Sequence, residues 1–202
     1  RLENLKGNMS ANAALSLMSL QATTLYGIGA YQDAIYKADK AIEAAAARQI
    51  PDKEADARAV RMMCYHRLNK DRLAEQDARA IIDNLQSNAA KSVQGRALVL
   101  LSSCARGEGN LDAAAQYSSR AVDLLQPLHA SLDLAHALTE QGQVLLVHGD
   151  QKRAGVALKK ACEQAMKVRQ STPEAYRRDF VDSLQEIFSV HIEFLLRKGK
   201  VA

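Results

Sequence analysis

The 202-residue sequence contains no tryptophan and few residues of the kinds on which β-sheet proteins depend. Only three prolines, ten glycines, six tyrosines and three phenylalanines are spread over the chain. A β-sandwich needs frequent turns and strand-forming aromatic residues, so this composition argues against one. Alanine runs, such as the one at residues 44–47, favour helix instead.

Long apolar runs and paired cysteines are also missing. No uninterrupted apolar stretch approaches the ~18 residues of a membrane-spanning helix, so we expect no membrane association. The three cysteines, Cys64, Cys104 and Cys162, are odd in number and form no CxxC pair. This pattern is typical of reduced, packed thiols in a cytoplasmic protein rather than of a disulfide framework or a zinc site.

The charge balance is mild. Twenty-seven basic and 23 acidic residues give a net charge of +4, too little to indicate a nucleic-acid-binding protein. A hydrophobic fraction of 48% is ordinary for a globular protein, and the length suits one large domain or two small ones. Since the chain begins at Arg1 rather than Met, we expect it to be a piece of a longer protein.

A repeat of 40 residues is the strongest pattern in the sequence. A Gly or Asn recurs at constant spacing, at Gly29, Asn69, Gly109 and Gly149. Five residues after each comes an alanine, and the same register continues further along. The recurring positions are Ala34, Ala74, Ala114 and Ala154, then Ala41, Ile81, Ala121 and Ala161.

Each repeat is predicted to be a helical hairpin. Gly, or Asn in its place, adopts the left-handed conformation that ends a helix, and Asp or Asn near the turn caps the next helix. The small alanine lets the second helix lie close to the first. We expect helices at residues 11–27, 31–47, 53–68, 71–86, 89–107, 111–126, 129–148, 151–170 and 174–198. The prolines, Pro51, Pro127 and Pro173, fall between successive hairpins.

This Gly-then-Ala turn resembles that of the tetratricopeptide repeat (TPR) family, over about residues 11–170. The period departs from that family, whose standard repeat is about 34 residues. The resemblance implies an all-α fold, a right-handed α-superhelix of stacked helical hairpins, as a single domain over 1–202. The repeats would cover 11–48, 52–87, 89–126 and 129–170. HEAT and armadillo repeats, with periods of about 40–47 residues, are the structural rivals.

The tail breaks the period. From Pro173 a long helix is predicted, with an apolar stripe followed by a turn-like basic end at residues 197–200. The stripe comprises Phe180, Leu184, Ile187, Phe188, His191 and Leu195. Residues 173–202 form either a capping helix or the start of a fifth repeat, and both interpretations stay open.

Within the TPR family, ligands meet the first helix of each hairpin on the concave face. By register, the resemblance places there Tyr26, Asp56, Met63, His66, Arg67, Arg96, Ser103, Arg106, His136 and Gln143. Arg67, Arg96 and Arg106 could form a cationic strip for a carboxylate, or could be solvated or paired with Asp56. The carboxylate clamp of chaperone-binding TPR proteins is missing.

Catalysis finds little support in the sequence. It contains no HExxH, GxGxxG or GxxxxGK[ST] motif, so no enzyme activity and no cofactor are expected. His129, Asp133 and His136 could share one helix face, but no fourth ligand is evident and no metal is expected. A basic helix is predicted over 151–170, with Lys159, Lys160 and Lys167, and we interpret it as a solvated face. Because this helix has no aromatic residues on which bases could stack, no nucleic-acid binding is expected.

These observations predict a non-catalytic protein- or peptide-binding scaffold. Resemblance to the lengthened repeats of bacterial signalling proteins implies the sensory or interaction region of a larger signalling or transcription-regulating protein. Two alternatives stay open. One is an accessory region of an enzyme, such as a diguanylate cyclase or protease-like protein, whose catalytic part lies outside this sequence; the other is a homodimer formed through 174–198.

Overall fold

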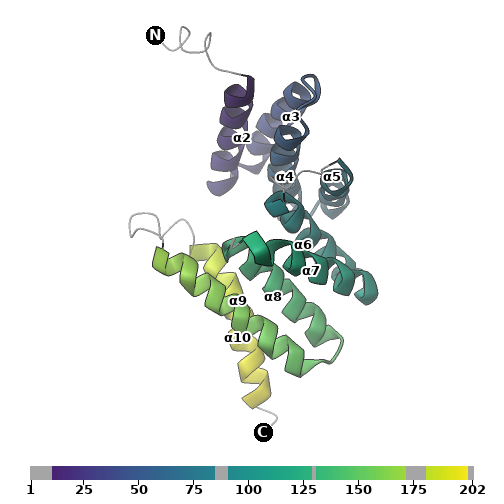
Figure 1. Ribbon diagram of the computed structural model, residues 1–202, viewed down its shortest axis with the longest axis vertical. Helices are drawn as coiled ribbons and strands as arrows, with labels where there is room; N and C mark the ends of the chain where they lie inside the picture. The colour runs from purple at the N-terminus through teal and green to yellow at the C-terminus, as the bar shows by residue number, and fades with distance from the viewer. Residues whose placement is uncertain (1–10, 85–90, 129–130, 172–180, 200–202) are drawn as a thin grey trace. The chain divides into compact units, whose positions relative to one another are not determined.

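The computed structural model describes residues 11–84, 91–128, 131–171 and 181–199, which are helical apart from short turns (Figure 1). In chain order the elements are α2 (Ala11–Gly27), α3 (Tyr31–Ala46), α4 (Pro51–Arg67), α5 (Asp71–Asn84), α6 (Lys91–Gly107), α7 (Leu111–Leu125), the short 3₁₀ helix η2 (Gln126–Leu128), α8 (Ser131–Val147), α9 (Gln151–Ser171) and α10 (Val181–Gly199). Most predicted boundaries are confirmed to within two residues. The expected helix residues 85–86, 89–90, 129–130 and 174–180 lie outside the described part of the chain.

The four predicted turn residues all adopt the left-handed conformation. Their φ angles are +79° at Gly29, +54° at Asn69, +79° at Gly109 and +83° at Gly149. Each begins the same hydrogen-bond pattern: the amide of Gly29 donates to the carbonyl of Tyr26, and the next amide donates five residues back. Such a pattern satisfies the carbonyls at the end of the helix. The 40-residue repeat of the sequence therefore corresponds to a 40-residue repeat of backbone conformation and hydrogen bonding.

Capping of the next helix varies between repeats. The side chains of Asn110 and Asp150 accept bonds from the backbone amides of Ala113 and Arg153, at 3.3 and 3.0 Å. Ala30, at the equivalent position of the first repeat, has no side chain that can do so. Pro51 occupies the first turn of α4, where its missing amide hydrogen costs nothing.

The recurring alanines form the contact between the two helices of each hairpin. Ala34, Ala74, Ala114 and Ala154 are all 0% exposed. Helices α8 and α9 also approach each other closely at Gly142, because a Cβ added there would lie 2.6 Å from Cδ2 of Leu158. Small residues in this register let two helix backbones pack together with little space between them.

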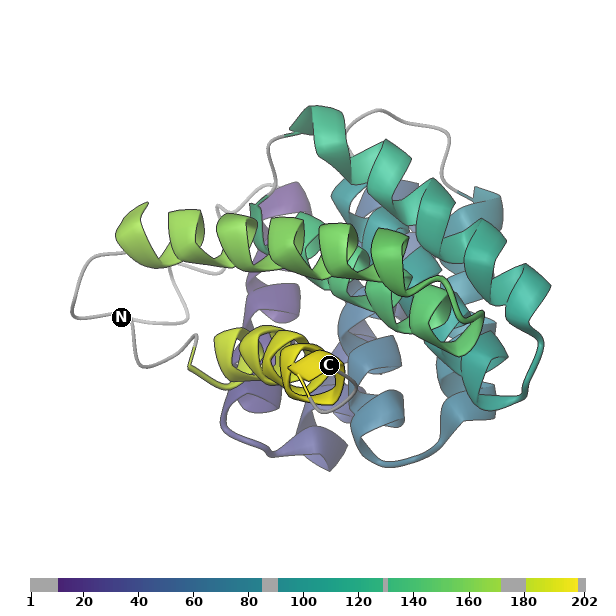
Figure 2. The ribbon, with the colours of Figure 1, turned by 90° about the horizontal axis from the view of Figure 1, so that it is seen from below.

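The chain divides into two compact units, residues 1–97 and 98–202, with the boundary inside α6. In the first unit α3 packs against α2 and α4, and α4 packs against α5. In the second unit α8 packs against both α7 and α9, and α10 lies against α9 and α8 (Figure 2). The organisation of 1–202 as a single domain stays a prediction.

The tail helix differs in part from its prediction. Leu184 and Ile187 are buried as expected, but Leu195 is 52% exposed and Phe194 is buried in its place. The ring of Phe194 lies against Gly155 of α9, which has no side chain to exclude it. The turn expected at residues 197–200 is not present in its described part, because α10 continues through Gly199. Pro173, Phe180 and Lys200 lie outside the described residues.

Candidate protein-binding surfaces

The site residues predicted in the first unit are largely engaged with neighbours. Nε of Arg67 donates to the hydroxyl of Tyr26 at 3.2 Å, which links α4 to α2. Nδ1 of His66 lies 2.9 Å from a carboxylate oxygen of Asp71. Asp56, considered above as a partner for arginine, instead pairs with Lys53 at 3.3 Å, and Met63 is half-buried on the same helix.

Arg96 also belongs to the first unit and is half-buried on α6. Its Nε is buried and makes no hydrogen bond to the residues that the structure describes. Arg106, in contrast, belongs to the second unit. A joint strip of Arg67, Arg96 and Arg106 therefore stays a prediction.

Arg106 is held by a buried carboxylate that the sequence analysis missed. Nε and Nη2 of Arg106 donate to the two oxygens of Glu140, each at 3.0 Å, and Nη2 also donates to Oε1 of Gln143 at 2.9 Å. Glu140 is 6% exposed and lies 3.1 Å from the hydroxyl of Ser102. The hydrogen bonds to Glu140 raise the pKa of Arg106 above its ordinary value. Ser103 is a further contact of Nη2, at 3.5 Å.

The sequence repeat could have revealed that Glu140 is unusual. The residues at the same position of the other three repeats are Leu20, Val60 and Leu100, so an acidic residue replaces an apolar one in this repeat alone. A carboxylate at a buried register position requires a cation nearby. Arg106, one hairpin earlier, supplies it.

A pocket of about 680 Å³ opens beside Arg106 in the second unit. We call it the α6–α8–α10 pocket; it is lined by Arg106, Gln143, Leu146, Val147, Gln151, Val190, Glu193, Phe194, Arg197 and Lys198. Two of the ten predicted site residues, Arg106 and Gln143, thus share one wall. His136 is half-buried on α8, seven residues before Gln143 and so on the same side of the helix.

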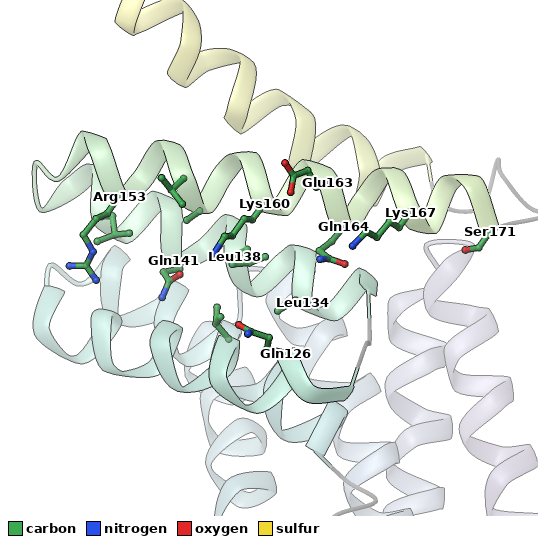
Figure 3. A pocket seen from close by; sticks show the side chains of 14 residues that line it. Gln126, Leu134, Leu138, Gln141, Arg153, Lys160, Glu163, Gln164, Lys167 and Ser171 are labelled. Carbon is green, nitrogen blue, oxygen red and sulfur yellow. The ribbon is translucent and has the colours of Figure 1, made fainter.

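A larger cavity, of about 850 Å³, lies between α7 and α9 with α8 as its floor (Figure 3). We call it the α7–α9 groove. Leu134, Leu138 and Leu145 of α8 contribute apolar surface. Figure 3 shows Lys160 and Lys167 of α9 extending over this floor.

The place equivalent to the α7–α9 groove in the first unit is largely filled by side chains. Six residues that line a cavity of only about 180 Å³ each lie 80 positions before a residue of the α7–α9 groove: Arg58, Arg61, Tyr65, Leu73, Gln76 and Asp77. Arg58 and Arg61 both donate to Asp77, at distances from 2.6 to 3.1 Å. Internal ion pairs thus occupy the space that stays open in the second unit.

The described residues include one close cysteine–histidine pair but no cluster suited to metal binding. Among them, no three His, Cys, Asp or Glu side chains could hold one metal ion, and His129 lies outside them. Sγ of Cys162 lies 3.2 Å from Nδ1 of His191. Burial raises the pKa of the Cys162 thiol, and Glu163 adds to the effect, so the protonated thiol is favoured over the thiolate.

None of the described helices is long and apolar enough to cross a bilayer.

No model of a known protein family matches this sequence, and no curated protein sequence matches it. Solved structures do match in fold. BtubC (BKLC) from P. vanneervenii is 18% identical with a TM-score of 0.64, covering 83% of this chain and 69% of that one. A Podosopora anserina putative kinesin light chain with nearly identical TPR-like repeats is 12% identical with a TM-score of 0.60, covering 96% of this chain and 100% of that one.

Identities this low concern the fold alone. The matches in fold agree with two features of this chain: four left-handed turns at 40-residue spacing and buried alanines in register. The chain has an all-α, TPR-like helical-repeat fold.

Proposed function

We propose that this chain is a non-catalytic scaffold that binds a protein or peptide segment in the α6–α8–α10 pocket. The observation that carries the proposal is the state of Arg106. Its Nε and Nη2 are fixed by Glu140 and Gln143, and Nη1 makes no hydrogen bond to any described residue. A guanidinium already held in position loses little side-chain entropy when it meets a ligand.

The rest of the pocket suits a peptide with an acidic group and apolar side chains. Lys198 adds a second cation to the wall, and Leu146, Val147 and Val190 offer apolar contacts. A ligand carboxylate would accept from Nη1 of Arg106, since charge-assisted bonds of this kind are stronger than neutral ones. We also propose that the chain is the sensory or interaction region of a larger signalling or transcription-regulating protein in the cytoplasm. This part of the proposal rests on the lengthened repeat.

The test must leave Glu140 paired. Replacing Arg106 by an acidic residue would place two carboxylates together in a buried position and would damage the fold. Gln143→Glu with Lys198→Glu changes the pocket's charge, while the carboxylate introduced at position 143 can still accept from Arg106. Lys159→Glu with Gln170→Glu is the matched control, because both residues are exposed on α9 and line neither cavity.

The experiment is affinity capture from a lysate of the source organism with wild type and both variants, followed by binding measurements with the purified partner. We expect one partner to be retained by wild type and the control and lost with the pocket variant. A partner retained equally by all three would show that the pocket is not its binding site.

Self-association through α10 is a second candidate, favoured by a specific observation. Ile192, Leu195 and Leu196 form an apolar stripe on α10 and are 52–62% exposed. Sedimentation of wild type and of Leu195→Glu tests it. A mass that falls from dimer to monomer on substitution would support pairing of α10 helices, and a monomeric wild type would exclude it.

A further inference from the structure

We infer that the α7–α9 groove is a second docking surface, and that it binds an amphipathic protein helix with an acidic flank. This goes beyond the proposed function, because the groove and the α6–α8–α10 pocket lie on opposite sides of α8. The groove uses Leu134, Leu138, Gln141 and Leu145, whereas the pocket uses Gln143, Leu146 and Val147. At about 100° per residue these two sets face away from each other.

The spacing of the groove residues suits a helix. Those of α8 are separated by four, three and four residues, the seam that a packed helix presents to a neighbour. Six of the eight groove residues of α9 follow the same alternation from Arg153 to Ser171, a length of about 27 Å at about 1.5 Å per residue. Val156 and Glu163 each lie one position before a member of that series. A helix of similar length could lie between α7 and α9, with its apolar stripe on the floor.

The surface available to this stripe is apolar but incompletely covered. Leu134 and Leu138 are 5% and 6% exposed at the base, Leu145 is half-buried, and Val156 on the α9 wall is 54% exposed. A partner would gain most by covering Leu145 and Val156. Burial of such area is the main favourable contribution to helix docking.

The α9 side of the groove, which we call its rim, is basic and therefore favours a partner helix with acidic residues beside its apolar stripe. Arg153, Lys160 and Lys167 line the groove on the α9 side, and no described acidic side chain forms an ion pair with Lys160 or Lys167. Arg153 keeps 72% of its side chain exposed despite a 3.7 Å contact with Asp150. Glu163 also lines the groove, so the three cations exceed the acidic groups by two. Carboxylates at seven-residue spacing on a partner helix would match Lys160 and Lys167.

In the first unit, charged side chains that pair with one another fill the place equivalent to the groove. There Glu54, Arg58, Arg61 and Tyr65 replace the four α8 residues of the groove. Arg58 pairs with Glu54 and with Asp77, and Arg61 pairs with Asp77 and Asp39. In the second unit the equivalent of the Arg61–Asp39 pair is a 3.5 Å contact of Gln141 with Ser119. The charges that close the first groove are thus replaced by uncharged residues, and Lys160 and Lys167 form no ion pair with any residue that the structure describes.

The test is selection from a phage-displayed library of random 18-residue peptides against the full 202-residue chain, with anisotropy measurements on the enriched peptides. We expect sequences with an apolar residue every three or four positions and Asp or Glu beside them. Lys160→Glu with Lys167→Glu should weaken them about tenfold or more, as should higher salt. Lys159→Glu with Arg169→Glu, which makes the same charge change outside the groove, should leave binding unchanged.

Several outcomes would overturn the inference. They are no enrichment, enriched peptides without acidic residues, equal losses with both double variants, and loss only with the pocket variant Gln143→Glu, Lys198→Glu. Single-stranded RNA and anionic vesicles are measured in parallel. If Lys160→Glu with Lys167→Glu weakens one of these but no peptide, the rim serves a nucleic acid or a membrane instead.

Discussion

Arg61 and Asp77 form a two-point ion pair between α4 and α5: Nε lies 2.8 Å from Oδ2, and Nη2 lies 2.6 Å from Oδ1. Asp77 is 2% exposed, and the hydrogen bond to it raises the pKa of Arg61. The corresponding residues in the last complete repeat are Gln141 and Ala157. The same hairpin geometry is therefore compatible with a charged seam and with an uncharged one.

Asp77→Ala should lower the free energy of unfolding by about 3–5 kcal/mol, because it leaves Arg58 and Arg61 partly buried without their shared carboxylate. Urea denaturation measures this loss. Adding Arg58→Leu and Arg61→Gln to Asp77→Ala installs the residues of the last repeat. We expect this triple variant to recover most of the stability. A triple variant as unstable as Asp77→Ala would mean that the network itself stabilises the first unit.

Gly142→Ala should destabilise the second unit by about 1–3 kcal/mol through overpacking. The added methyl would meet Leu158 at 2.6 Å, while Gly27→Ala, with nothing within 4 Å, serves as the control. In a double-mutant cycle with Leu158→Ala the two costs should be less than additive, because the smaller side chain makes room for the methyl. Full additivity in thermal or urea unfolding would contradict the close approach.

Gly149→Ala should cost about 1 kcal/mol or more, since a Cβ is disfavoured at a φ of +83°. Asn69→Gly, at a φ of +54°, should be neutral or slightly stabilising. Gly107→Ala is the control, because Gly107 closes α6 just before such a turn without a left-handed φ. Melting temperatures of the three variants check the order. Equal effects at Gly107 and Gly149 would argue against the conformational explanation.

Cys64 predicts an alkaline dependence of stability. Burial raises the pKa of its thiol to about 11, from an ordinary value of 9.0. Below the ordinary value both states keep the proton, and stability is unaffected. As pH rises through this window, the unfolded chain loses the proton while the folded chain retains it, so the free energy of unfolding falls. Cys64→Ala should reduce that slope in urea titrations over the same pH range; an unchanged slope would assign it to other groups.

Much of the fold was determined by local features of the sequence. The turns at Gly29, Asn69, Gly109 and Gly149 depend on backbone conformations that a single residue sets, and their spacing alone locates the hairpins. The alanines in register predicted where two helices approach each other. These preferences act between residues a few positions apart, so they can be inferred without knowing the rest of the structure.

The side-chain pairings and cavities depended on tertiary structure. Arg106 was predicted to contact a ligand, but its partner Glu140 lies 34 residues away on another helix. The Arg61–Asp77 pair and the open α7–α9 groove occupy equivalent positions, and only the packed helices show that one is filled and the other empty. The repeat period locates the helices. Whether each groove is filled or open depends on a few charged or apolar side chains that the fold brings together from distant parts of the chain.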